Sequence, residues 1–133
     1  MVKTKIVLWL ENDEQRPMVM DPVMNLMVLD DMKCTVFSEN PTSVSKVNKN
    51  TFRGVVGETE EKDIEPLINR LKSVLRNTLL NNVKHTYTCN IVLVFVVKMI
   101  SGDTPSLSFD PELISLLNSL PARVNFDLYS REE

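Results

Sequence analysis

The single histidine and the two cysteines are the residue types in this chain best suited to nucleophilic catalysis or zinc binding. His85 lies in a polar stretch, and Cys34 and Cys89 are far apart and belong to no C-x-x-C motif. A Cys-His or Ser-His site needs a positioned histidine base, and a structural zinc ion needs four ligands. We therefore expect His85 to be a surface loop residue and both cysteines to be buried free thiols.

Acidic residues could supply acid-base or metal chemistry if Asp30-Asp31, Asp110 and Asp127 met in space. Each of them has a simpler structural interpretation. Asp30-Asp31 forms a turn before a strand, Asp110 caps a helix, and Asp127 lies on the polar face of the last strand. The three glycines are scattered, so they cannot form a phosphate-binding loop. We expect no catalytic residue, no cofactor and no metal.

A run of acids is the strongest local charge feature, with five carboxylates in eight residues and Lys62 as the only cation among them. Such a run fits the start of a helix, where acids favour the positive end of the helix dipole. It also fits an acidic docking patch, and the two interpretations are compatible. The acids of the run are Glu58, Glu60, Glu61, Asp63 and Glu65.

The chain has 133 residues, 43% of them hydrophobic, which predicts one domain over residues 1–133 with a substantial core. Its 15 Lys and Arg against 18 Asp and Glu give a net charge of -3. This balance argues against nucleic acid as a partner and favours a basic protein. Lys98 interrupts the longest apolar run, and the first residues lack a secretion signal, so we expect a cytoplasmic protein without membrane contact.

The first half predicts strands over Lys5–Leu10, Met32–Phe37 and Thr51–Val56, with a polar loop over Ser38–Asn50. Residues 18–31 fit neither a clean helix nor a clean strand. Trp9 and the methionines of residues 18–32 either fill the core or line a binding surface.

Helical spacing of apolar residues in the second half predicts a helix over Ile64–Leu79, with Asp63 as its N-cap because Pro66 is tolerated only in the first turn. Thr86–Ile100 predicts a strand. Its segment Ile91–Val97 is apolar on both faces, which is typical of a central strand covered on both sides.

The end of the chain predicts a short helix that begins at Asp110-Pro111 and stops at Pro121, followed by an alternating strand over Val124–Leu128. The resulting order of elements predicts an α+β, two-layer fold. In this fold, helices pack on one face of a mostly antiparallel sheet. A right-handed crossover joins the last two strands if they run parallel.

The stretch from about Glu60 to Tyr129 resembles a bacterial domain-of-unknown-function family, number 4279. The resemblance rests on the helix DIEPLINRLKSVL, the apolar strand, the segment PSLSFDPELISLLNSLPA and the ending VNFDLY. The family opens its last helix with an acid or Ser and Pro, here Asp110-Pro111, and ends in an I-D-x-D-x-Y-like strand, here Asn125 to Tyr129. The resemblance implies a small cytoplasmic protein of the immunity type, encoded beside secreted toxins, with no catalytic residues to transfer.

We therefore expect a non-enzymatic immunity protein that binds and neutralises a cognate toxin domain, a nuclease of a contact-dependent or polymorphic system. An acidic inhibitor would associate quickly with the basic substrate channel of a nuclease and block it. We expect a monomer or weak dimer. One alternative is an enzyme that uses Asp30, Asp31 or Asp127, and another is a structural protein that self-associates through the last strand or the Met-rich segment. The expected partner-binding residues are Glu58, Glu60, Glu61 and Asp103.

Overall fold

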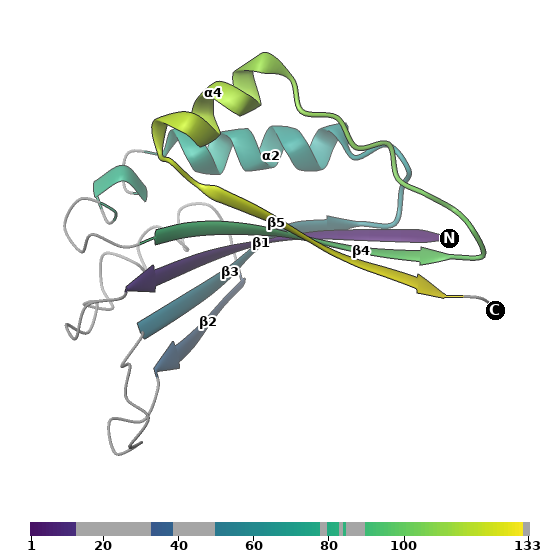
Figure 1. Cartoon of the computed structure of the whole chain (residues 1–133), viewed down its shortest axis with the longest axis horizontal. Helices are drawn as coiled ribbons and strands as arrows, with labels where there is room; N and C mark the ends of the chain where they lie inside the picture. The colour runs from purple at the N-terminus through teal and green to yellow at the C-terminus, as the bar shows by residue number, and fades with distance from the viewer. Residues whose placement is uncertain (13–32, 39–49, 78–79, 83, 85–89, 132–133) are drawn as a thin grey trace.

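The computed structural model describes residues 1–12, 33–38, 50–77, 80–82, 84 and 90–131. Its named elements begin with three strands and continue with an alternation of helices and strands (Figure 1). In chain order they are β1 (Val2–Asn12), β2 (Lys33–Ser38), β3 (Asn50–Thr59), α2 (Glu65–Arg76), β4 (Asn90–Ile100), α4 (Pro111–Ser119) and β5 (Arg123–Arg131).

The strands form one sheet in the order β2-β3-β1-β4-β5, and α2 and α4 lie together over one of its faces (Figure 1). Three of the four strand pairings are antiparallel. The fourth, between β4 and β5, is parallel because α4 carries the chain back across the sheet. The predicted α+β fold with helices on one face is confirmed, and its sheet is mixed.

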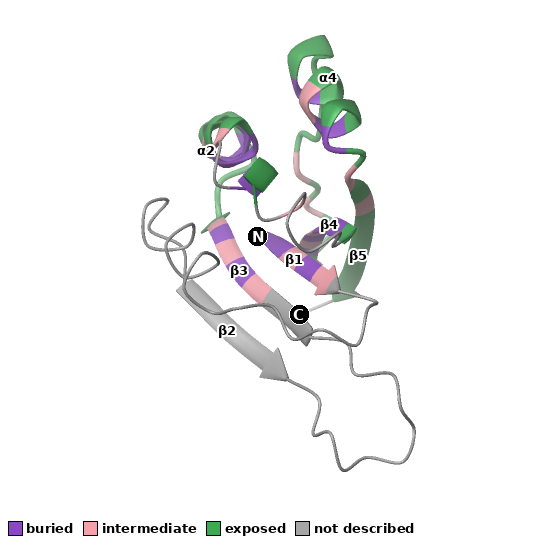
Figure 2. Ribbon diagram, turned by 90° about the vertical axis from the view of Figure 1, so that its left-hand side faces the viewer, coloured by how far each residue is buried: buried purple, intermediate pink, exposed green. Residues whose placement is uncertain are grey.

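Side chains alternate along β1 because successive residues of a strand point to opposite faces. Ile6, Leu8 and Leu10 are fully buried beneath the helices, whereas Lys5 and Trp9 lie on the opposite face and are partly exposed. Figure 2 shows the buried residues of α2 turned toward this sheet. The core therefore lies between the sheet and the helix layer.

Phe95 of β4 lies in the middle of that core and is completely buried. Its ring centroid is 5.4 Å from that of Phe109, in the segment before α4, and 5.4 Å from that of Phe126 on β5. Leu71 of α2 and Leu113 of α4 are also almost fully buried in the same cluster. The rings of Phe95, Phe109 and Phe126 thus pack β4, β5 and the segment before α4 together.

The N-cap of α2 is Ile64, so the prediction of Asp63 was wrong by one residue. Asp63 still satisfies a free backbone group, because its Oδ1 accepts the N–H of Glu65 at 3.0 Å. The helix ends at Arg76, where Asn77 takes an extended backbone, instead of continuing to Leu79. The apolar spacing continued past the point at which the backbone leaves the helix.

Several strands are longer than the sequence pattern indicated. β1 extends over Val2–Asn12, and β3 continues to Thr59, so Glu58 belongs to a strand and not to a helix start. β4 begins at Asn90. The predictions for residues 18–31, His85 and Cys89 fall outside the described residues. For Cys34 the structure describes only its position in β2.

Among the described elements, helices cover only one face of β4, where the sequence predicted cover on both faces. Leu93, Phe95 and Val97 are buried under the helices. On the other face Val92 is buried, whereas Val94 and Val96 are only partly buried. No described helix lies on that face (Figure 1). Valines suit this position without a second helix layer because they pack against cross-strand neighbours, as Val94 does opposite Val7.

No helix among the described residues is long and apolar enough to span a membrane.

Candidate functional site

Three of the predicted partner-binding residues lie where β3 ends. Glu58 is in the strand, opposite Lys5 of β1, and Glu60 and Glu61 follow in an exposed bend. The backbone N–H of Glu61 donates to Thr59 Oγ1 at 3.1 Å, which shapes this bend. None of the three carboxylates forms an ion pair with another described residue.

Asp103 lies at the same end of the sheet, in the turn after β4. Ser101 and Gly102 have φ values of 58° and 80°, and this left-handed backbone reverses the chain. Asp103 then forms ion pairs with the Met1 ammonium group and with Lys62, whose Nζ is 3.4 Å away. These two cations, with the hydrogen bond from the Met1 ammonium as the larger cause, hold the pKa of Asp103 below its usual value.

The structure therefore gathers all four predicted residues at one end of the molecule. The segment after β3 and the turn after β4 run side by side, because Ser106 N–H donates to the Lys62 carbonyl at 3.1 Å and Asp63 forms a bridge with Ser106. Asp103 differs from the three glutamates because it is already ion-paired. We name the exposed carboxylates Glu58, Glu60 and Glu61 the acidic end.

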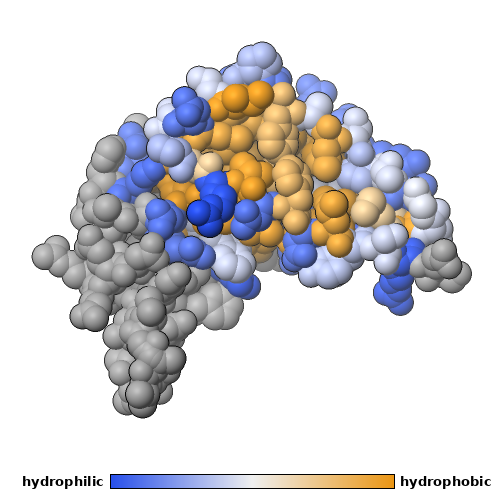
Figure 3. All heavy atoms as spheres, in the orientation of Figure 1, coloured by the Kyte–Doolittle hydropathy of each residue, from blue (hydrophilic) through white to orange (hydrophobic). Residues whose placement is uncertain are grey.

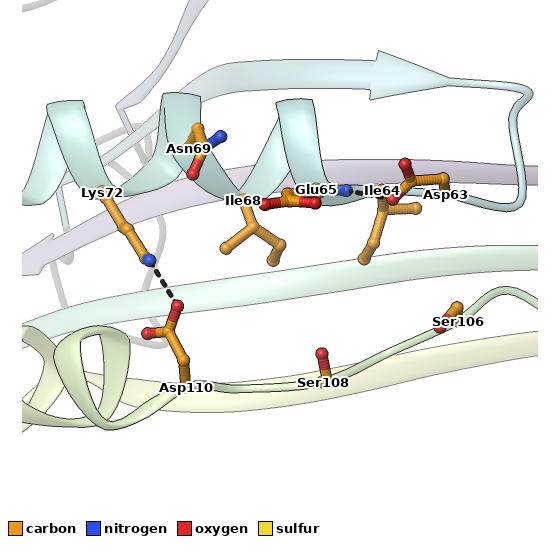
Figure 4. Close-up of a pocket in the computed structure, with 9 residues that line it drawn as sticks. All are labelled: Asp63, Ile64, Glu65, Ile68, Asn69, Lys72, Ser106, Ser108 and Asp110. Carbon is orange, nitrogen blue, oxygen red and sulfur yellow. Dashed lines mark hydrogen bonds and ion pairs between the residues drawn. The ribbon is translucent and has the colours of Figure 1, made fainter.

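A polar groove of about 320 Å³ opens directly beside the acidic end, between α2 and the extended segment 106–110 (Figure 4). Figure 4 shows α2 on one side of the groove and the extended segment, with its two serines, on the other. Three carboxylates and one ammonium group border it. The lining residues are Asp63, Ile64, Glu65, Ile68, Asn69, Lys72, Ser106, Ser108 and Asp110.

Lys72 and Asp110 close one end of this groove with an ion pair that joins the two helices. Lys72 is only 8% exposed, and its Nζ donates to Asp110 Oδ2 at 2.5 Å. The other oxygen of Asp110 accepts the N–H of Leu113 at 2.8 Å, which confirms the predicted N-cap of α4. The Lys72 hydrogen bond, followed by that of Leu113, lowers the pKa of Asp110.

Sequence reasoning identified Asp110 but missed Lys72. A signal was present, because Lys72 falls in the apolar stripe of α2 between Ile68 and Leu75, where an ammonium group requires an acidic partner. Glu112, in the first turn of α4, supplies a second partner at 3.5 Å and also pairs with Arg76. The groove is thus the meeting point of charged residues from both helices.

The stability of the protein is expected to fall as the pH drops below about 4. The folded pKa values of Asp103 and Asp110 lie below their unfolded values, so their contribution is present above the unfolded pKa and disappears as the pH falls through the folded pKa. Both groups are exposed, so solvent screens the effect. Urea unfolding midpoints at about pH 7 and about pH 3 measure it.

The variant Asp110→Asn is the control for this pH dependence. Asparagine can still accept the N–H of Leu113 as an N-cap, but it does not titrate. Its unfolding midpoint should therefore fall less than that of the wild type between the two pH values. An identical pH dependence in the variant and the wild type would contradict the assignment.

The opposite face of the sheet is predominantly basic, although the whole chain is acidic. Two hollows of about 600 and 680 Å³ lie on this face. Lys3 and Lys98 stand directly opposite each other there, and the Arg53 guanidinium lies 3.7 Å over the Trp9 ring. Trp9 is thus on the open face of the sheet and not in the core. The cations lining the hollows of this face are Lys3, Lys5, Arg53, Lys98, Arg123 and Arg131, beside the acids Glu11, Glu58 and Asp127.

The carboxylates considered for catalysis do not gather in the described part of the chain. Asp127 accepts the Tyr129 hydroxyl at 2.9 Å, and Asp110 belongs to the helix pair. Asp30 and Asp31 lie outside the described residues. Within the described ranges, no three His, Cys, Asp or Glu side chains form a group that could hold a metal ion.

The comparison with protein families gives one match, to the domain of unknown function DUF4279 over residues 41–131. This range is more than half of the chain and includes the helix, strand and terminal motifs on which the resemblance rested. No curated protein and no solved structure matches the chain. The chain therefore belongs to the DUF4279 family.

Proposed function

We propose that this protein is a non-enzymatic immunity protein that binds a cognate toxin domain and neutralises it in the cytoplasm. The toxin is a nuclease of a contact-dependent or polymorphic toxin system. The observation that carries the proposal is the polar groove bordered by Asp63, Glu65 and Asp110, which continues into the exposed acidic end. Together, the groove and the acidic end present a concave, negatively charged surface that complements a basic protein surface.

The charges of the groove favour a cationic side chain as its occupant. Lys72 already neutralises Asp110, whereas Asp63 and Glu65 form no ion pair with a described residue. The serine hydroxyls on the opposite wall can accept further hydrogen bonds from an ammonium or guanidinium group. A lysine or arginine from the rim of a nuclease channel fits this chemistry.

The acidic end would act earlier, during encounter. A nuclease needs a positive channel to bind its substrate, and exposed carboxylates attract such a channel over several ångströms at low salt. The position of Glu60 and Glu61 in an exposed bend suits this role. Asp103 contributes to the same field, although its ion pairs reduce its effect.

The test uses the purified product of the gene directly upstream of the one that encodes this chain, as the candidate toxin domain. Increasing amounts of the protein should inhibit its nuclease activity, with complete inhibition near equal molar amounts. Gel-based cleavage of DNA and RNA substrates measures this inhibition. Full nuclease activity in the presence of a molar excess of the folded protein would overturn the immunity proposal.

The double variant Glu60→Lys and Glu61→Lys is expected to slow association with this toxin by about tenfold at low salt, because charge reversal replaces attraction with repulsion. Stopped-flow fluorescence measures the association rate. A control is Glu11→Lys, a single charge reversal at the other end of β1, opposite Asn90, to be compared per reversed charge. Equal rates for the double variant and the control would remove the acidic end from the interface.

A further inference from the structure

β5 lies at the edge of the sheet and exposes large apolar side chains to solvent. Phe126 and Leu128 are 50% and 58% exposed. Figure 3 shows apolar side chains gathered on the face of the molecule that α4 and β5 present. A contiguous apolar surface of this kind marks an interaction site.

The backbone of β5 is also available for pairing. β5 is last in the sheet order and pairs with β4 alone, so its outer edge has no strand partner in the described part of the chain. The strand is nine residues long, contains neither proline nor glycine, and pairs with β4 without a bulge. Proline and bulges commonly protect an edge strand, and an edge without them can serve as a template for another strand.

We propose that β5 binds β5 of a second copy of this chain in an antiparallel arrangement centred on Phe126. The two copies are related by a twofold axis perpendicular to the sheet, which is the commonest symmetry of protein dimers. This axis joins the two five-stranded sheets into one continuous sheet and keeps the helices of both copies on the same face.

The register centred on Phe126 covers the exposed apolar residues. Phe126 lies opposite Phe126 of the second copy, and Val124 lies opposite Leu128. These residues share the helix side of the sheet, because Phe126 packs against Phe95 and Phe109 there. Aromatic and β-branched residues directly opposite each other stabilise an antiparallel pair.

The same register gives favourable pairs on the open face. Asn125 lies opposite Asp127, where an amide can donate to a carboxylate, and Arg123 lies opposite Tyr129, where a cation can stack on a ring. Shifting the centre to Asp127 would place Asp127 opposite its own counterpart and Arg123 opposite Arg131. Like charges directly opposite each other are destabilising, so the charges of β5 disfavour that register.

Sedimentation equilibrium of the full chain tests the dimer. The expected mass at high concentration is twice the 15.2 kDa of one chain. Leu128→Lys should raise the dissociation constant by at least about tenfold, because it places a charged side chain in the apolar row at the paired edge. Leu128 is more than half exposed, so the variant should fold normally, as circular dichroism can verify.

Ile114→Lys is the matched control, since it makes the same kind of change at a similarly exposed residue on α4. It should leave the dissociation constant nearly unchanged. Loss of the dimer in Ile114→Lys but not in Leu128→Lys would overturn the proposal in favour of a helix interface. A monomer at every concentration would also overturn it. So would the finding that β5 pairs only with a strand of a different protein and never with a second copy of this chain.

Hydrogen exchange distinguishes strand pairing from simple apolar contact. The outward-pointing backbone N–H groups of β5 should exchange more slowly as the protein concentration rises, because pairing places them in hydrogen bonds. A dimer without this protection would contradict the proposed geometry. None of these measurements involves a toxin, so their failure would leave the proposed immunity function standing.

Discussion

Phe95→Ala is expected to lower the free energy of unfolding by about 4 kcal/mol. Phe95 is completely buried, and its ring contacts those of Phe109 and Phe126. Alanine would leave a cavity between β4, β5 and the segment before α4, three parts of the chain that cannot all move inward. Because the stability of a typical domain is about 5–15 kcal/mol, this loss would bring the protein close to unfolding.

Urea unfolding followed by tryptophan fluorescence and by far-ultraviolet circular dichroism measures this change. Phe95→Leu is the matched control, because leucine retains most of the apolar volume and should cost less than alanine. The terminal strand should be affected strongly, since Phe126 loses its contact with Phe95. A change below about 1 kcal/mol would show that the aromatic group is not central to the core.

Gly57→Val is expected to destabilise the protein by about 2 kcal/mol. A Cβ atom at Gly57 would lie 2.7 Å from Leu67 Cδ1 and 3.8 Å from Arg70 Cδ. Leu67 is buried, and Arg70 is held to β3 because its Nε donates to the Val56 carbonyl at 2.7 Å. The Leu67 side chain therefore occupies the space that a side chain at Gly57 would need.

The rescue of this variant by Leu67→Ala tests the contact directly. Leu67→Ala alone should destabilise the protein, because it leaves a cavity. In the double variant the valine can occupy part of that space, so the combined loss should be smaller than the sum of the two single losses. Thermal or urea unfolding of all four proteins completes the cycle. Strict additivity would mean that the two residues do not compete for the same space.

The local elements were predictable because their signals lie within a few residues. Asp110-Pro111 marks the start of α4 in both the sequence and the structure, and Asp110 caps the helix as expected. The apolar spacing after Ile64 likewise identified α2. Element ends were less accurate, because the N-cap of α2 is Ile64 and not Asp63, and the helix ends at Arg76.

The order of the strands depends on long-range pairing and could not be read from periodicity. β1 lies between β3 and β4, and the register of β1 with β3 shifts between Ile6 and Val7. The apolar segment Ile91–Val97 suggested cover on both faces, but the helices that the structure describes lie over only one of them. A strand sequence records how apolar its two faces are, and not which element lies above each.

The candidate site was likewise predictable where its residues are neighbours in the sequence, and not where they meet only in the fold. The acids that follow one another along the chain were identifiable, and the structure brings Asp103 to them through Lys62. The groove was not predictable, because its walls are separated by about 40 residues, as Lys72 and Asp110 illustrate. The net charge also gave no indication that basic residues gather on one face of the sheet. Lys3 and Lys98, for example, come together only when β1 and β4 pair.

The position of β1 has a consequence for synthesis on the ribosome. β1 precedes both of its neighbours in the chain, and its two edges are completed by strands that end at Thr59 and Ile100. At a translation rate of roughly 5–20 residues per second, the second neighbour emerges roughly 2–8 seconds after the first. During that interval the unpaired edge of β1, with its free backbone N–H and C=O groups, remains available to chaperones or to other nascent chains. Slower translation before residue 100 should therefore increase misassembly.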